Sequence, residues 1–169
     1  MKKSIALVNL IVLSVMLLIS CGKLYVQPSP NAKVSPDGRF IAYNDGTVLD
    51  IKTNLMWAAK DNGTNVDWLA AKFYCESYRG GGHEDWRLPA LDELESLYNE
   101  NKAHPASCAD SHHVHIATEF IDITCLTVWA SEISMTTNEV AIFDFNTGFR
   151  SAFAVNMAIC RALPVRHAQ

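Results

Sequence analysis

The sequence predicts an α+β domain in which two helices pack on short antiparallel strands and disulfides cross-link the chain. Apolar residues recur at helical spacing in two segments, and β-favouring segments with turn signals stand before and after them. Apolar residues make up 49% of the 169-residue chain and charged residues 19%, a composition typical of a chain that folds around a core. Its length is that of one ordinary domain, even without a short N-terminal leader.

A β-hairpin followed by a helix opens the predicted domain. Asp45-Gly46 is a turn signal, and residues 47–51 and 54–58 have the composition of two short strands joined by a turn. Asp67 is suited to cap a helix that runs through Tyr78, because its carboxylate can accept hydrogen bonds from the first free amides. One face of this helix carries Trp68, Ala71, Cys75 and Tyr78.

A second helix follows a glycine stop. Gly80-Gly81-Gly82 ends the first helix, and the second is expected to start near Pro89, since proline suits a first helical turn. Asp92 and Glu93 favour the positive end of that helix. Its buried residues are expected to be Leu91, Leu94, Leu97 and Tyr98.

The last third of the globular part is expected to be strands. Residues 99–124 are predicted to be irregular, and Asn146-Thr147-Gly148 is a hairpin turn. The predicted strands are residues 127–131, 139–145, 149–155 and 159–166.

Residues 1–20 are predicted to be a signal peptide. Lys2 and Lys3 precede an apolar run from Ile5 to Ile19. At a rise of about 1.5 Å per residue this run covers roughly 22 Å, less than the roughly 30 Å needed to span a bilayer. Leu18-Ile19-Ser20-Cys21 resembles the bacterial lipobox, in which the cysteine is diacylated and becomes the new N-terminus.

Cys21 is therefore expected to anchor the chain in membrane lipid. The alternatives are an uncleaved anchor, ordinary secretion, or a plain buried cysteine. An aspartate directly after the lipidated cysteine is associated with retention in the inner membrane. This chain has Gly22 at that position, so an outer-membrane location is expected if the cell is Gram-negative.

The rest of the chain divides into a tether and one domain. Residues 21–38 contain Pro28, Pro30 and Pro36 among polar residues and are expected to form a flexible tether before a globular domain at 39–169. The formal net charge of the whole chain is −4, and it becomes −6 when Lys2 and Lys3 are removed with the signal peptide. This charge disfavours nucleic acid as a partner.

Four cysteines remain after lipidation of Cys21. Cys75, Cys108, Cys125 and Cys160 are an even number in an exported chain, which favours disulfides and leaves three pairings open. The smallest spacing between them is 17 positions, whereas zinc sites use close pairs such as C-x-x-C.

Seven short motifs together resemble one family. In chain order they are Gly46-Thr47-Val48-Leu49-Asp50, Leu55-Met56-Trp57, Tyr74-Cys75, Asp85-Trp86-Arg87-Leu88-Pro89, Asp92-Glu93-Leu94, Trp129-Ala130-Ser131 and Pro164-Val165-Arg166. The chain from about residue 40 to 166 resembles the Lcl C-terminal-domain family of bacterial exported proteins, a domain of unknown function. The resemblance implies a C-type lectin-like fold, with a Cys75–Cys160 disulfide enclosing a Cys108–Cys125 disulfide. Many members carry a cysteine where this chain has Pro164, so the resemblance assigns Cys160, four residues earlier, as the partner of Cys75.

Several motifs have a functional and a structural interpretation. Asp85-Trp86-Arg87-Leu88-Pro89 is either a ligand site or a segment that locks a loop onto the core, and the second interpretation is preferred. The alternation Asp61-x-Gly63-x-Asn65-x-Asp67 resembles a calcium loop, but Lys72 stands where the bidentate glutamate is required, which favours a turn and a helix cap. The weak candidates for metal ligands are His112, His113 and His115, with His104, Asp110 and Glu119 nearby.

The sequence contains no recognised catalytic motif, and no cofactor is expected. The leading hypothesis is a lipid-anchored, non-catalytic binding module of the cell envelope that uses residues 99–137 to bind a carbohydrate, a peptide or a protein. One alternative is a structural lipoprotein that assembles with itself or with an envelope complex. Another is a metal- or thiol-dependent enzyme acting through groups such as His113 or Cys75.

Overall fold

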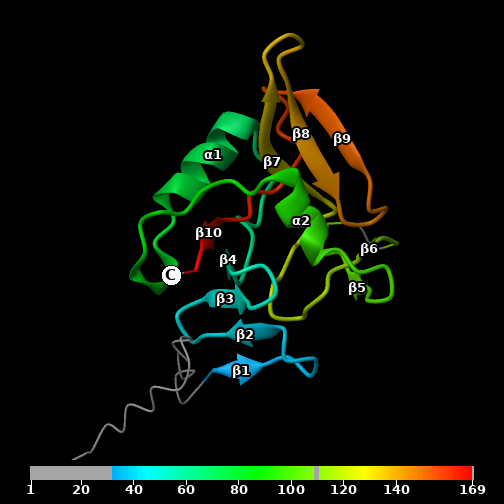
Figure 1. Cartoon of the computed structure of the whole chain (residues 1–169). Helices are drawn as coiled ribbons and strands as arrows, with labels where there is room; N and C mark the ends of the chain where they lie inside the picture. The colour runs from blue at the N-terminus through cyan, green and yellow to red at the C-terminus, as the bar shows by residue number, and fades with distance from the viewer. Residues whose placement is uncertain (1–31, 109–110, 169) are drawn as a thin grey trace, which may run out of the picture.

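A computed structural model describes residues 32–108 and 111–168 (Figure 1). The α-helices of this part of the chain are α1 (Trp68–Ser77) and α2 (Leu91–Leu97), and a 3-10 turn, η1, covers Gly80–Gly82. The strands are β1 (Lys33–Val34), β2 (Phe40–Ala42), β3 (Thr47–Asp50), β4 (Leu55–Ala58), β5 (His104–Pro105), β6 (His113–Val114), β7 (Thr127–Ser134), β8 (Glu139–Asp144), β9 (Arg150–Ala154) and β10 (Val165–His167).

The largest sheet has five antiparallel strands in the order β1-β2-β3-β4-β10. The predicted hairpin at residues 47–58 is β3 and β4, and Asn54 in its turn has a φ of 56°. The C-terminal strand β10 returns to pair with β4, with Val165 opposite Trp57. The end of the expected tether also takes part, because β1 pairs with β2.

The second main sheet has three antiparallel strands in the order β7-β8-β9. An irregularity between Trp129 and Ile133 bends β7, and the β7–β8 hairpin projects from the body of the molecule (Figure 1). The predicted turn at Asn146-Thr147-Gly148 joins β8 to β9, and Gly148 has a φ of +75°, which glycine adopts at little cost. A third sheet contains β5 and β6.

Two apolar clusters form the core. The larger one surrounds Trp57 and Phe143, both fully buried, and joins the five-stranded sheet to α2 and β8. The smaller one surrounds Trp129, also fully buried, and joins α1 to β7 and β8. The Trp129 Nε1–H donates to the Val66 carbonyl at 2.8 Å, which fixes the segment before α1 on this cluster.

Both helices begin as the sequence predicts. The Asp67 carboxylate accepts a hydrogen bond from the Ala70 amide at 2.8 Å and caps α1. Pro89 lies just before α2, and Glu93 reaches back to accept from the Ala90 amide at 2.8 Å. Leu94 and Leu97 are the buried residues of α2.

The predicted α+β, C-type lectin-like class is wrong, because the structure is mostly β. Across the described residues ten strands form three sheets, whereas α1 has 10 residues and α2 only 7. The segment expected to be irregular contributes β5 and β6, and the residues before the hairpin contribute β1 and β2. Strands of two or three residues are too short to show the alternation typical of a strand, so local periodicity does not reveal them.

One predicted disulfide is present and the other is not. Cys108 and Cys125 are bonded, with their Cα atoms 5.3 Å apart. Cys75 and Cys160 are free thiols in the described structure, so the Cys75–Cys160 disulfide implied by the resemblance is not formed. Both lie fully buried in the smaller apolar cluster and act there as small apolar side chains.

These two thiols are expected to be unreactive in the native protein. Burial raises the pKa of Cys75 far above its usual value and that of Cys160 to about 11, which disfavours the nucleophilic thiolate. Alkylation followed by mass spectrometry should label neither residue at neutral pH and both after denaturation. Because the raised pKa values belong to the folded state, the free energy of unfolding should fall as the pH rises from 9 toward 11, by up to about 1.4 kcal/mol per pH unit for each thiol. Rapid labelling of the native protein would contradict this account.

The signal peptide at 1–20, the lipidation site Cys21 and the tether up to residue 31 lie outside the described residues. Within the described ranges, no helix has the length and apolar character required to cross a bilayer.

Candidate functional site

The Asp85-Trp86-Arg87-Leu88-Pro89 stretch fastens a loop to the core, as preferred from the sequence. Trp86 is 2% exposed, and its ring meets that of Tyr78 edge-on with centroids 4.8 Å apart. Asp85 forms an ion pair at 2.6 Å with Arg166, a β10 residue that is itself buried. Leu88 and Pro89 are also buried.

Arg87 is the member of this stretch that faces a cavity. Its guanidinium makes two hydrogen bonds of 2.7 Å to the Glu93 carboxylate and one of 3.1 Å to the Leu88 carbonyl. Burial alone would raise the pKa of Glu93, but the bonds from Arg87 and the Ala90 amide outweigh it and hold the pKa below its usual value. The bonds to Glu93 raise the pKa of Arg87. The pair is therefore fully ionised at neutral pH, and its planar geometry is fixed.

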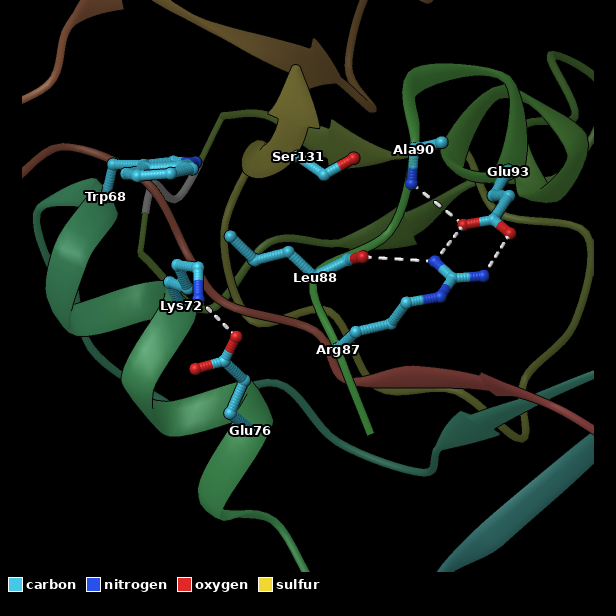
Figure 2. Close-up of a pocket in the computed structure, with 8 residues that line it drawn as sticks. All are labelled: Trp68, Lys72, Glu76, Arg87, Leu88, Ala90, Glu93 and Ser131. Atoms are coloured by element: carbon cyan, nitrogen blue, oxygen red, sulfur yellow. Dashed lines mark hydrogen bonds and ion pairs between the residues drawn. The ribbon is translucent and has the colours of Figure 1, made fainter. Parts of the chain in front are cut away.

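An open groove with a volume of about 430 Å³ lies between α1 and the start of α2 (Figure 2). It is lined by Trp68, Lys72, Glu76, Arg87, Leu88, Ala90, Glu93 and Ser131. The α1 residues stand on one side, Arg87 and Glu93 on the other, and Leu88 lies between them (Figure 2).

The α1 side of the groove presents one aromatic ring and one ion pair. Trp68, Lys72 and Glu76 are four residues apart, so they share one face of the helix. The Trp68 Nε1–H donates to the Ala130 carbonyl at 2.9 Å, which holds the half-buried indole in place. Lys72 and Glu76 are bonded to each other and remain 45% and 52% exposed.

A second cavity of about 270 Å³ lies within residues 99–137, the segment expected to bind a ligand. Its lining is mixed and comprises the apolar Pro105, Val114, Ile116, Ile121 and Ile123 and the polar His104, Glu119 and Asp122. The Nε2 atom of His104 is buried there without a hydrogen-bond partner in the described structure. This cavity is smaller than the groove, and its polar side chains are His104, Glu119 and Asp122.

The histidines weighed as metal ligands do not converge. His112 and His113 are exposed, and the Nδ1 atom of His115 lies 3.2 Å from the Glu100 carbonyl oxygen. Across residues 32–108 and 111–168, no three His, Cys, Asp or Glu side chains gather as a metal site would require. Asp110, counted with the cluster in the sequence, lies outside the described residues.

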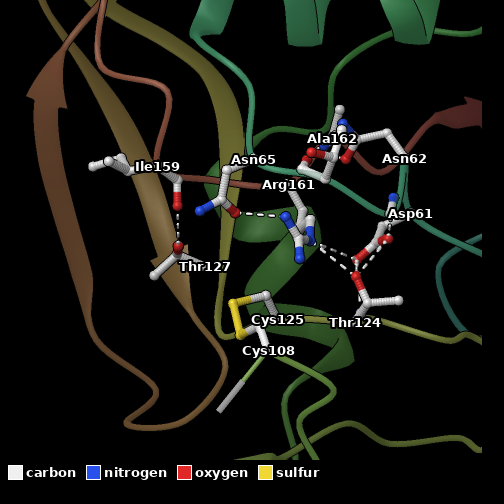
Figure 3. Close-up of polar contacts among 12 residues, drawn as sticks. Asp61, Asn62, Asn65, Cys108, Thr124, Cys125, Thr127, Ile159, Arg161 and Ala162 are labelled. Carbon is white, nitrogen blue, oxygen red and sulfur yellow. Dashed lines mark hydrogen bonds and ion pairs between the residues drawn. A yellow bond between two sulfur atoms is a disulfide. The ribbon is translucent and has the colours of Figure 1, made fainter.

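A buried polar network holds the loop before α1 against the segment that precedes β7 and against the C-terminal segment (Figure 3). The Asp61 carboxylate accepts hydrogen bonds from the amides of Gly63 and Thr124, both at 2.7 Å. Arg161 donates to the Thr124 hydroxyl at 2.9 Å and to the Asn65 side chain at 2.6 Å. The alternation from Asp61 to Asp67 thus forms a turn and a helix cap, as the sequence favoured over a calcium loop.

Most of the residues that line the groove were not predicted from the sequence as binding residues. Of its lining residues only Ser131 lies within the expected segment 99–137, while Arg87 and Leu88 belong to the 85–89 stretch, for which a ligand site was the less favoured interpretation. The spacing of Trp68, Lys72 and Glu76 along one helix face was a signal for a functional surface. It was not sufficient, because the other side of the groove comes from segments distant in the sequence, the farthest at Ser131.

The family comparison bears out the resemblance. No curated protein matches the chain. The model of the Lcl C-terminal domain matches residues 46–166, which is more than two thirds of the sequence and includes the strand β3 and both sides of the groove. The chain therefore belongs to the Lcl C-terminal domain family.

Proposed function

We propose that this protein is a lipid-anchored lipoprotein of the bacterial cell envelope whose globular domain binds a short, neutral carbohydrate in the groove between α1 and α2. The domain has no catalytic role in this proposal. The observation that carries it is the pairing of charges in the groove, since Lys72 pairs with Glu76 and Arg87 with Glu93. The groove lining therefore has no net charge.

This pairing selects against ions and for hydroxyl groups. A charged ligand would have to compete with an existing ion pair for its partner. A neutral hydroxyl can instead donate to a free lone pair of Glu76 or Glu93 and accept from an unused N–H of Lys72 or Arg87. Such added hydrogen bonds orient a ligand without breaking either pair.

The apolar part of the groove complements the other face of a sugar ring. Trp68 offers an aromatic surface at the rim and Leu88 an aliphatic surface in the floor. Trp68 is anchored by its bond to Ala130, so little side-chain entropy is lost when a ring packs on it.

The anchoring part of the proposal rests on the N-terminal sequence. A basic start, an apolar run too short to span a bilayer and the lipobox ending in Cys21 support export and acylation. Gly22 after the cysteine supports an outer-membrane location if the cell is Gram-negative.

A glycan array probed with the full chain and with two variants tests the binding proposal. Wild type is expected to bind short neutral glycans in preference to sulfated or sialylated ones. Trp68→Ala should weaken this binding about tenfold, because it removes the aromatic surface. Phe73→Ala is the matched control, since Phe73 lies on the same helix, is 73% exposed and does not line the groove.

Two outcomes would overturn the proposal. One is that wild type binds no neutral glycan or prefers sulfated ones. The other is that Phe73→Ala reduces binding as much as Trp68→Ala does.

A further inference from the structure

The outer edge of β9 is an unpaired sheet edge. β9 pairs with β8 on one side, and no strand of the described residues runs along its other side (Figure 1). The strand reads Arg150-Ser151-Ala152-Phe153-Ala154, and its first three residues are exposed. Edge strands are usually protected by proline, lysine or inward-pointing charges. This strand has one charge, Arg150 at its start, and no proline.

The hydrogen bonds at the two ends of β9 define which of its groups point outward. The Asp144 amide donates to the Phe149 carbonyl at 3.0 Å, and the Val155 amide donates to the Asn138 carbonyl at 3.4 Å. Along an antiparallel strand the backbone N–H and C=O groups of successive residues point to alternate sides. The backbone groups of residues 149, 151, 153 and 155 therefore point toward β8, and those of residues 150, 152 and 154 point outward.

Most of these outward groups have no partner among the described residues. The Ala154 carbonyl accepts from the Met157 amide at 3.1 Å. The amides of Arg150, Ala152 and Ala154 and the carbonyls of Arg150 and Ala152 make no hydrogen bond with any described group. The edge therefore offers a regular row of donors and acceptors.

We propose that β9 pairs antiparallel with β9 of a second copy of this chain, about a two-fold axis through Ala152. Ala152 would lie opposite Ala152 of the second copy, and Arg150 opposite Ala154 of the second copy. Four backbone hydrogen bonds would form between groups that are unpaired within one chain, and the two three-stranded sheets would become one continuous sheet.

The side chains along this edge are self-complementary in this register. Phe149, 72% exposed at one end of the strand, would lie opposite the half-buried Val155 of the second copy, and symmetry repeats the contact. Opposed residues in such a pair have side chains close enough to bury apolar surface.

The charges favour the same register. Arg150 of the second copy would stand beside Ala154, whose neighbour on β8 is the exposed Glu139. The small alanine leaves room for the guanidinium to approach that carboxylate. Within its own chain Arg150 bonds Asp92 and Glu95 through Nη2, so Nε and Nη1 remain available.

Cysteine cross-linking of the full chain in cell envelopes tests this register. Opposed residues in a hydrogen-bonded pair have Cα atoms about 5.5 Å apart, a separation that a disulfide can span. Under mild oxidation Ala152→Cys should give covalent homodimers at about ten times the level of Thr137→Cys, an exposed control site on the β7–β8 hairpin. Cys75 and Cys160 are buried, and the unmodified chain measures any remaining background. Equal cross-linking at both positions, or cross-linking of Ala152→Cys only to a different protein, would overturn the proposal.

Analytical ultracentrifugation of the detergent-solubilised full chain provides a second test. Ala152→Pro removes an outward amide and no bond to β8, so it should raise the dimer dissociation constant about thirtyfold while circular dichroism stays unchanged. If that variant does not fold, Ala152→Lys is used to test dimerisation, because it places two positive charges opposite each other at the two-fold axis. A folded variant of either kind that dimerises like wild type would refute β9 pairing.

Discussion

Asp61→Ala is expected to lower the free energy of unfolding by about 3–5 kcal/mol, because it leaves the buried Arg161 cation and two part-buried amides without their carboxylate partner. The Asp61 side chain is fully buried, accepts from the amides of Gly63 and Thr124, and lies 3.8 Å from the Arg161 Nε atom. A loss of this size is a large fraction of the stability of a typical domain. Chemical denaturation of the purified variant and wild type measures it.

The matched control for this prediction is Asp67→Ala, in the same loop. Asp67 caps α1 at the surface, so its removal should cost about 1 kcal/mol. If Asp61→Ala proves no more destabilising than Asp67→Ala, the buried network does not hold the loop before α1 in place.

Trp129→Ala is expected to cost a similar amount, about 3–5 kcal/mol, because it opens a large cavity in the smaller core cluster. Trp129 is fully buried, and its indole N–H bonds the Val66 carbonyl at 2.8 Å. Trp129→Phe should cost about 1–3 kcal/mol, since it leaves that carbonyl unpaired. Trp57→Phe is the comparison, because the Trp57 Nε1 atom is buried without a hydrogen-bond partner in the described structure and loses no bond.

Thermal or urea unfolding of wild type and the three variants measures the order of these losses in stability. We expect wild type and Trp57→Phe to be closest in stability, followed by Trp129→Phe and then Trp129→Ala. A Trp129→Ala variant within about 1 kcal/mol of wild type would contradict the assignment of Trp129 to the centre of its cluster.

The parts of the fold that the sequence revealed are those determined locally. The Asp67 cap, the turn at residues 146–148 and the turn between β3 and β4 act within a few residues, so α1, the two hairpins and their turns were predicted near their observed bounds. The resemblance correctly indicated the family and the Cys108–Cys125 disulfide.

The parts that the sequence did not reveal are either very short or assembled from distant segments. The strands β1, β2, β5 and β6 have only two or three residues each and show no periodic pattern, so the fold class was wrong. Cys75 and Cys160 do share a cluster, as their predicted pairing required, but they pack there as thiols. The groove joins residues from α1, α2 and β7, and no local pattern could show that Trp68 and Glu93 face the same space.

The most direct test of the central claim is nuclear magnetic resonance of the indole N–H groups of the full chain during titration with short neutral oligosaccharides. The four tryptophans give four such signals, and Trp68→Phe identifies the signal of Trp68 by its loss. If the groove is the binding site, the Trp68 signal shifts in a saturable way with a neutral trisaccharide, and the signals of Trp57 and Trp129 do not move. A saturable shift confined to the buried tryptophans, or no saturable shift with any neutral oligosaccharide, would contradict the assignment of the groove as a carbohydrate site.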